Sequence, residues 1–219
     1  SNAGGSIGTS ASYSNYYLVA NTATPSYPFA AASTAGGCYA TPDHGTTVFS
    51  SATAQAARDA IAAASSGGMV KVAGYCAGVS SGNVVTINKA LTLTGGYTST
   101  DWSTYSPSAS PTTLDAQGAG RVISITGAVA TTIQGLTVTN GFVGGGLDGA
   151  GIHTNGPITI SDSLVLSNTA TGTFSVGGGG AFNGSAHVTG TTFMSNTATL
   201  HGGGGYFAGS TYVTGTTFM

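Results

Sequence analysis

Ser163-Leu-Val-Leu-Ser-Asn168 has one counterpart earlier in the chain, Gly135-Leu-Thr-Val-Thr-Asn140, and one later, Thr191-Thr-Phe-Met-Ser-Asn196. The closing asparagines lie 28 residues apart in both steps. The heptapeptide Val188-Thr-Gly-Thr-Thr-Phe-Met194 also recurs letter for letter at Val213-Thr-Gly-Thr-Thr-Phe-Met219. A repeat of this length, built from residues that favour strands, indicates a solenoid in which each repeat is one turn of a stack.

Each repeat combines a glycine run with short apolar segments. The glycine runs are Gly144 to Gly146, Gly177 to Gly180 and Gly202 to Gly205. Three short strands per repeat, separated by Gly and Asn, are typical of one turn of a parallel β-helix. A helical solenoid is excluded because Thr, Val and Gly at this density oppose helix formation. The sequence therefore predicts an all-β fold, a parallel β-helix.

The repeated asparagines are predicted to be structural. Stacked turns align equivalent positions into columns. Asn140, Asn168 and Asn196 would then form a ladder, inside the stack or lining a turn, in which each side-chain amide bonds to the next. The glycine runs would lie where the backbone needs positive φ or passes close to the neighbouring turn.

Composition narrows the classes of partner. The 219-residue chain has a formal net charge of −2, and only 5% of its residues are charged, so neither nucleic acid nor an anionic membrane surface is expected to bind it. Its 40% of hydrophobic residues, at regular positions, favour a folded core over disorder. No apolar run approaches the ~18 residues that suggest a transmembrane helix.

We expect three regions along the chain. Residues 1–50, rich in Ser, Thr, Ala, Tyr and Pro without periodicity, are interpreted as an irregular N-terminal layer. Residues 51–67 are predicted to hold a capping α-helix that covers the open end of the stack. Residues 68–219 form the β-helix. Gln55, Arg58 and Asp59 of the helix are expected to face away from the stack. Its apolar face is predicted to comprise Ala56, Ala57, Ala60, Ile61 and Ala64.

The two cysteines, Cys38 and Cys76, lie in the N-terminal layer and just after the first predicted strand. Either they form one disulfide, which joins the layer to the region of the cap, or both are buried thiols. The disulfide is favoured because the chain has neither a helical Cys-x-x-Cys motif nor a metal-ligand spacing. By loop-closure entropy such a bridge contributes on the order of 4 kcal/mol.

A family resemblance follows from four segments in the first half of the stack. They are Ala56-Ala-Arg-Asp-Ala-Ile-Ala-Ala-Ala64, Gly67-Gly-Met-Val-Lys-Val-Ala73, Leu91-Thr-Leu-Thr-Gly-Gly-Tyr97 and Thr112-Thr-Leu-Asp-Ala-Gln117. They resemble the start of secreted bacterial right-handed β-helix proteins of the pectin-lyase-like superfamily. The resemblance implies a right-handed parallel β-helix but not an activity, because the superfamily contains lyases, hydrolases, tailspikes and adhesins.

The later turns resemble polymorphic outer membrane protein repeats, which are marked by Gly-Gly-Ala-Ile and Phe-x-x-Asn. Gly179-Gly-Ala-Phe182 and Phe193-Met-Ser-Asn196 match these marks approximately. In the two earlier repeats, Val165 and Thr137 are interpreted as replacing the phenylalanine. Together the two resemblances extend from about Thr53 to Met219.

The sequence gives little support to an enzyme. Lyases and hydrolases of the superfamily need clustered carboxylates for calcium binding or for acid and base chemistry. This chain has no Glu, and its aspartates are scattered. We therefore expect no catalytic, cofactor or metal site. Asp115 and Arg121 could lie together, more as a pair that fixes a turn than as an active site. The six aspartates are Asp43, Asp59, Asp101, Asp115, Asp148 and Asp162.

Histidines and aromatic residues are the remaining candidate binding groups. His153, His187 and His201 do not stack on one another in the 28-residue register, so no ligand column is expected. His153 with Asp148 is the nearest approach to a polar pair. The loop Thr98 to Pro111, which carries Trp102, is either a binding loop or, as favoured, packing on the turn below. The aromatic side chains of the repeats are predicted to stack in the core rather than on sugars; they are Phe182, Phe193, Tyr206, Phe207 and Phe218.

The expected function is non-enzymatic: a secreted or cell-surface β-helix that acts as a stalk or an adhesin, with glycans or a host or neighbouring cell surface as partner. The alternatives are a polysaccharide-active lyase or glycoside hydrolase, and a glycan-binding module without catalysis. No capping helix or charged edge strand is predicted in the repeats up to Met219. The chain is therefore expected to be truncated at its C-terminal end and to associate end to end, with another copy covering Val213 to Met219.

Overall fold

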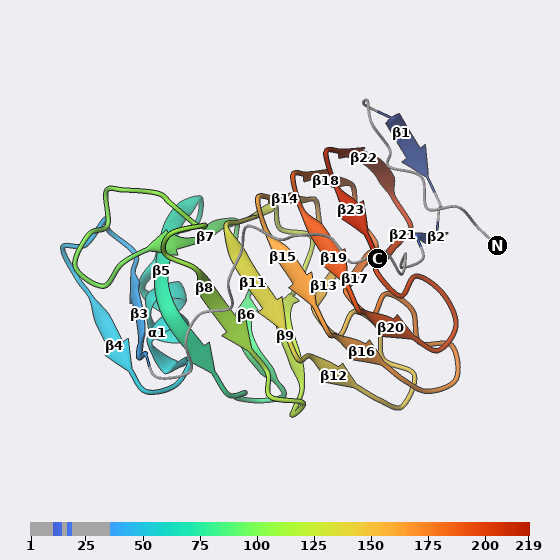
Figure 1. Ribbon diagram of the computed structural model, residues 1–219, viewed down its shortest axis with the longest axis horizontal. Coiled ribbons are helices and arrows are strands. Elements are labelled where there is room, and N and C mark those ends of the chain that lie inside the picture. The colour runs from blue at the N-terminus through green and yellow to red at the C-terminus, as the bar shows by residue number, and fades with distance from the viewer. Residues whose placement is uncertain (1–10, 15–16, 19–35) are drawn as a thin grey trace.

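A computed structural model describes residues 11–14, 17–18 and 36–219. It is a parallel β-solenoid of about six turns with one short helix, and the turns follow one another along the long axis of the molecule (Figure 1). The predicted all-β fold with a parallel stack is confirmed. Each turn runs through three main faces, and β5 (Gly68–Ala77) contributes to two of them.

The strands of the first face are parallel, and each pairs with the one in the next turn. The face begins with the first half of β5, and the sheet extends through the following turns. Its other strands are β7 (Leu91–Tyr97), β10 (Thr131–Gln134), β14 (Ile158–Ser161), β18 (Ala186–Thr189) and β22 (Ser210–Thr214).

The second and third faces repeat the same parallel pairing. The second face continues from the C-terminal half of β5 through β8 (Thr112–Asp115), β11 (Leu136–Thr139), β15 (Leu164–Leu166), β19 (Thr192–Met194) and β23 (Thr217–Phe218). The third face comprises β6 (Asn83–Ile87), β9 (Arg121–Ile125), β13 (Ile152–Thr154), β17 (Gly180–Phe182) and β21 (Gly205–Phe207).

A small fourth sheet was not predicted. It comprises β12 (Phe142–Val143), β16 (Thr169–Ala170) and β20 (Thr197–Ala198), which are parallel to one another. These strands have two residues each and follow directly after Gly141, Asn168 and Asn196. A two-residue strand leaves no alternation to read, so its pairing depends on the neighbouring turns.

The core of the stack contains columns of side chains that change in size along the axis. In the last turns, Phe182 stacks on Phe207 with ring centroids 4.9 Å apart, and Phe193 stacks on Phe218 at 4.8 Å. Gly180 makes room for the Phe182 ring, which would lie 2.2 Å from a β-carbon at that position. The earlier turns have smaller side chains in the same columns: Thr154 and Ile125 precede Phe182, and Val165 and Val138 precede Phe193. The core therefore stays filled while the residues change.

The helix α1 (Gln55–Ala63) covers the first turn (Figure 1), with Ala56, Ala57, Ala60 and Ile61 buried. The capping helix is therefore confirmed. The expectation that Arg58 faces away is wrong. Its Nη1 donates to the carbonyl oxygens of Gly78 and Val84, at 3.2 and 2.9 Å. These carbonyls belong to the first turn, so the arginine attaches the helix to the stack.

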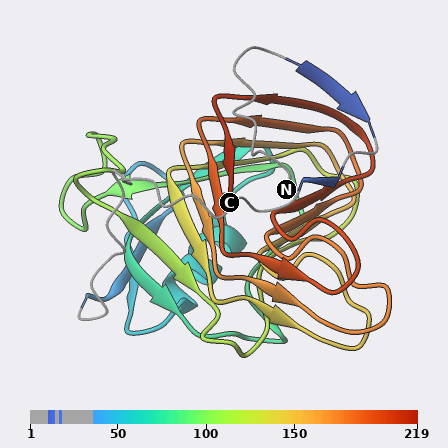
Figure 2. The same cartoon turned by 45° about the vertical axis from the view of Figure 1, so that its right-hand side comes forward.

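The N-terminal layer is not irregular where it is described. β3 (Cys38–Thr41) pairs antiparallel with both β4 (Phe49–Ser51) and β5. At the other end of the stack, β1 (Ala11–Ser14) pairs antiparallel with β22, and β2 (Tyr17–Leu18) pairs antiparallel with β21. Figure 2 shows β1 alongside the last turn. Strands of two to four residues are too short to give a periodic signal, which is why the sequence reads as irregular.

The pairing of β1 and β2 with the last turn changes the expectation for the C-terminal end of the stack. A second copy was expected to cover Val213 to Met219, yet the outer edge of β22 is paired with the chain's own β1, with Ala11 opposite Val213. The edge of β21 is paired with β2. β23 forms the end of its sheet in the described part of the chain. Association between copies stays a prediction.

The loop from Thr98 to Pro111 is packed against the first turns. Trp102 is 8% exposed, and its ring would lie 2.7 Å from a β-carbon at Gly45. Lys71 donates from Nζ to the Trp102 carbonyl oxygen at 2.5 Å and lies 4.7 Å above the Tyr97 ring. The Trp102 side chain therefore packs on the stack, as predicted, and is too buried to offer its ring to a ligand.

Candidate functional site

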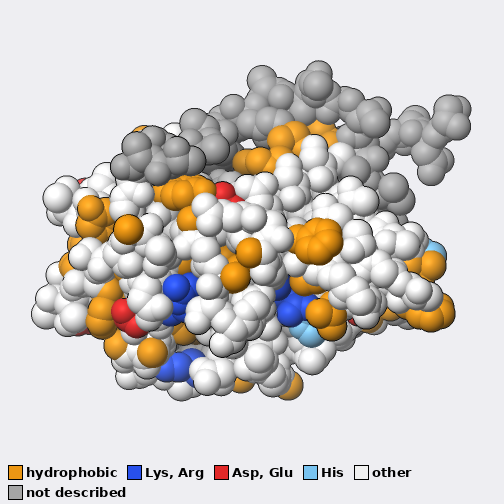
Figure 3. Space-filling model, turned by 90° about the horizontal axis from the view of Figure 1, so that it is seen from below, with side chains coloured by type: hydrophobic (Ala, Val, Ile, Leu, Met, Phe, Trp, Pro, Cys, Tyr) orange, Lys and Arg blue, Asp and Glu red, His pale blue; other side chains and the backbone are white. Residues whose placement is uncertain are grey.

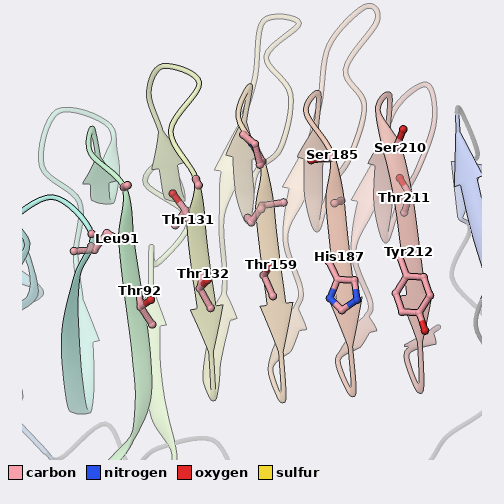
Figure 4. Close-up of a pocket in the computed structure, with 16 residues that line it drawn as sticks. Leu91, Thr92, Thr131, Thr132, Thr159, Ser185, His187, Ser210, Thr211 and Tyr212 are labelled. Atoms are coloured by element: carbon pink, nitrogen blue, oxygen red, sulfur yellow. The ribbon is translucent and has the colours of Figure 1, made fainter.

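An outward-facing row of side chains runs along the first face of the stack. Thr92, Thr132 and Thr159 occupy the same register position in β7, β10 and β14, and His187 and Tyr212 continue the row in β18 and β22. Figure 4 shows these five side chains next to one another, one on each of five strands that lie side by side. Since neighbouring strands are about 4.8 Å apart, the row is roughly 19 Å long.

The row is exposed because the strands alternate between core and solvent. Leu91, Ile158 and Ala186 precede the row residues and are buried, whereas Thr92, Thr132 and Thr159 are half-buried and His187 is exposed. Side chains on a strand point alternately to the two sides of the sheet. The hydrophobic repeat that builds the core therefore also fixes a hydroxyl row outside.

His187 and Tyr212 form a flat pair at one end of the row. Their rings are 4.7 Å apart between centroids and 4° from parallel. Stacking of this kind restricts the rotation of both side chains, so their polar atoms have defined positions. The row thus ends in an imidazole and a phenol rather than a further threonine.

The row lies in a groove of about 450 Å³ that spans five turns. Residues at or just before the start of the strands also line it, among them Gly67, Ala130, Pro157, Ser185 and Ser210. None of the described residues that line the groove is Asp, Glu, Lys or Arg. Its chemistry is therefore that of hydroxyl groups, backbone and one stacked aromatic pair.

The structural ladder connects Asn168 and Asn196. Asn168 is 0% exposed and Asn196 is 5% exposed, and Asn168 Nδ2 donates to Asn196 Oδ1 at 3.0 Å. Asn168 Nδ2 also donates to the Val138 carbonyl, and its Oδ1 accepts from the Gly141 amide at 2.7 Å. Side-chain amides thus satisfy buried backbone groups of the turn below.

Asn140 is not part of this ladder, which corrects the predicted register. Thr139 pairs with Leu166, so Asn140 aligns with Ser167 and Gly141 aligns with Asn168. Asn140 is exposed, has a φ of 54°, and donates from Nδ2 to Asp115 Oδ1 at 3.0 Å. The same shift of one residue places Val138, not Thr137, in the column of Phe193.

Asp115 and Arg121 do not pair with each other to fix a turn. Asp115 is 6% exposed and accepts hydrogen bonds from Tyr75 Oη at 2.5 Å and from Asn140. Burial, followed by this contact with Asp115, raises the pKa of Tyr75 to about 12. Arg121 instead donates to the carbonyl oxygens of Asp148 and Gly149. Asp148 and His153, the other polar pair, do lie in one pocket, together with Arg121.

The remaining candidate residues are placed as follows. Cys38 and Cys76 form a disulfide, which joins β3 to β5. No histidine aligns with another in the described strands, since His153 pairs with Ala181 and His187 with Tyr212. Within the described residues there is no group of three or more His, Cys, Asp or Glu that could hold a metal ion. No described helix is long and apolar enough to span a membrane.

Comparison with protein-family models, curated proteins and solved structures gave no match to this chain. The functional argument therefore depends on the geometry of the groove. The sequence contained a signal for it, because Thr92, Thr132 and Thr159 each follow the first residue of a predicted or observed strand. That signal was overlooked because the predicted 28-residue register starts from the asparagines, and the spacing of the groove residues varies between turns.

Proposed function

We propose that this protein is a non-enzymatic adhesin, either secreted or on the cell surface, and that the groove on its first face binds an extended, uncharged glycan. The observation that carries the proposal is the uninterrupted outward row from Thr92 to Tyr212, in register over five turns and with no formally charged side chain among the described residues that line the groove.

A linear glycan suits this groove in length and in chemistry. The row offers hydroxyl groups that both donate and accept hydrogen bonds, as sugar hydroxyls do. Its length of roughly 19 Å, from the strand spacing, accommodates an oligosaccharide of several units. A polyuronate would place carboxylates in a groove without a formal positive charge, and it would lose hydration without an ionic contact in return.

The disulfide and the family resemblance support the location. A bridge between Cys38 and Cys76 is typical of an oxidising compartment outside the cytosol. The resemblance to secreted pectin-lyase-like β-helices and to polymorphic outer membrane protein repeats points to the same compartment. A rigid stack that bears one binding face also fits a stalk that presents its ligand site outward.

The proposal is tested with a panel of neutral and acidic oligosaccharides. Isothermal titration would measure binding, and release of reducing ends or of unsaturated products would measure cleavage. We expect a neutral linear oligosaccharide to bind without cleavage. The double variant Thr132→Val and Thr159→Val should weaken that binding about tenfold, since two hydrogen bonds of about 0.7 kcal/mol each are lost.

Thr192→Val provides the matched control. Thr192 lies on the second face, at the outward position next to buried Phe193, so its loss tests surface chemistry away from the groove. Binding should be unchanged in this variant. Cleavage of a polyuronate would replace the proposal by the lyase or hydrolase alternative, and the absence of any glycan binding would leave the stalk without the adhesive groove.

A further inference from the structure

A second, smaller pocket lies on the third face, away from the groove. It is formed by three segments: β9 with the residues after it, the loop 146–148, and the end of β13 with Asn155. Its volume is about 400 Å³. Arg121, Asp148 and His153 all line it. Charged side chains are sparse on the face of Figure 3, where Lys or Arg side chains lie next to a His side chain.

Arg121 is held in place but retains donor capacity. Its Nε donates to the Gly149 carbonyl at 2.9 Å and its Nη2 to the Asp148 carbonyl at 2.7 Å. These two bonds fix the plane of the guanidinium group. Nη1 has no hydrogen-bond partner in the described part of the chain, and its two N–H groups are available to a ligand in the pocket.

Only one of the two carboxylate oxygens of Asp148 accepts a hydrogen bond from a described residue. Its Oδ1 accepts from the Val176 amide at 2.9 Å, and no ion pair joins the carboxylate to Arg121 among the described residues. The second carboxylate oxygen is therefore an acceptor without a described donor. The pocket contains a fixed cation and a fixed anion that do not neutralise each other by contact.

His153 adds a third polar group, on β13, which pairs with β9. It is half-buried in β13 and lies directly beside Ser124 of β9. Burial lowers the pKa of His153, and the charge of Arg121 lowers it further, while Asp148 opposes this. At neutral pH the ring is then uncharged, so it carries one donor and one acceptor. Leu147, 56% exposed, lies at the same pocket and provides an apolar surface.

We propose that this pocket binds a single uncharged polyol unit, such as one hexose residue, through a pair of adjacent hydroxyl groups. One hydroxyl accepts from Arg121 Nη1, and its neighbour donates to the free oxygen of Asp148. His153 contacts a third hydroxyl, and Leu147 packs on the C–H face of the ring. A simple anion fits less well, because the Asp148 carboxylate repels it.

The proposal is independent of the groove. The pocket is on the third face, and none of its residues lines the groove on the first face. Either site can therefore fail while the other holds. If both bind, the protein has two separate sugar contacts, one for an extended chain and one for a single unit.

The test is a titration of the full chain with methyl glycosides of common hexoses, observed by NMR at the His153 imidazole. A shift of the His153 signals that saturates with a Kd on the order of 1 mM is expected, since a ligand of this size binds weakly. Asp148→Asn should weaken it about tenfold, while its amide oxygen keeps the acceptor for Val176. The groove double variant Thr132→Val and Thr159→Val should titrate like the wild type.

Two further measurements make the outcome decisive. His153→Ala is compatible with the fold, because Ala181 occupies the same position one turn later, and it should weaken binding several-fold when followed at the Leu147 methyl signals. Sodium acetate and inorganic phosphate are the competing probes. Tighter binding of either anion to Asp148→Asn than to wild type, with no response to sugars, would identify an anion site and overturn the proposal. Unchanged signals with every glycoside at about 100 mM, roughly a hundred times the expected Kd, would also overturn it.

Discussion

Replacement of Asn168 by alanine should destabilise the protein far more than any change at Asn140. Asn168 is fully buried, and its side chain makes three hydrogen bonds: to the Gly141 amide, the Val138 carbonyl and Asn196 Oδ1. Removal leaves the buried Gly141 N–H without its acceptor, which costs about 2 kcal/mol, and the other two bonds contribute about 1 kcal/mol each. We therefore expect Asn168→Ala to lower the free energy of unfolding by about 4 kcal/mol.

The control variant is Asn140→Gly. Asn140 is exposed and makes one side-chain bond, to Asp115, and its φ of 54° suits glycine. A loss of about 1 kcal/mol or less is expected. Unfolding in urea, followed by circular dichroism, gives the two free energies. Native-state hydrogen exchange gives a local measure, because the Gly141 amide should lose protection only in Asn168→Ala.

Two results would refute this reasoning. One is an Asn140→Gly variant that is as unstable as Asn168→Ala, since it would mean that the sequence register, with all three asparagines in one ladder, is the correct one. The other is a Gly141 amide that remains protected in Asn168→Ala, which would show that the amide does not depend on the ladder.

Four other predictions can be tested on the same material. Thr131→Val should stabilise the protein by about 1 kcal/mol, because Thr131 Oγ1 is buried and has no hydrogen-bond partner among the described residues; Thr191→Val, which loses a 3.0 Å bond to the Thr189 carbonyl, should destabilise it, and equal effects in urea unfolding would contradict the assignment. The lowered pKa of His153, caused first by burial, means that its contribution to stability is present above its ordinary pKa of 6.5 and is lost as the pH falls through its folded value; thermal unfolding between pH 7 and 5 should accordingly depend less on pH in His153→Ala, and identical curves would be evidence against this. Cys38 and Cys76 should resist alkylation until a reductant is added, and replacing both with serine should cost on the order of 4 kcal/mol for a separation of 38 residues; rapid labelling of both thiols without reductant would exclude the bridge. Light scattering over a dilution series should show association between copies, and a strictly monomeric protein at all concentrations would exclude it.

The sequence predicts the stack well because its signals are local and repeated. The segments Ser163 to Ser167 and Thr191 to Ser195 are short runs of apolar residues bounded by Ser or Thr, and the structure has β15 and β19 there. The helix at residues 55–63 was readable from its alanine spacing alone. Each of these elements depends on residues within a few positions of one another, so a single window contains the information.

The candidate sites were less predictable because they depend on pairing between turns. Asn140 and Asn168 each end a similar six-residue segment, so the sequence suggests that they align. The pairing of Thr139 with Leu166 shows instead that Gly141, one residue later, aligns with Asn168. Arg121 and His153 are brought together by the pairing of β9 with β13. Asp148 joins them from the loop that precedes β13, whose path no periodic pattern encodes. The groove required the outward positions of five separate strands to be aligned at once.

The glycine and asparagine columns allow the protein to be lengthened in whole units. Ala186 pairs with Thr211 and Val188 with Val213, so the intervening 25 positions are complete as a building block. A gene in which residues 186–210 are written twice should encode a rod that is longer by one strand spacing, about 4.8 Å. A series of such duplications would set the distance between two groups attached to the ends of the stack, in steps smaller than one turn of an α-helix.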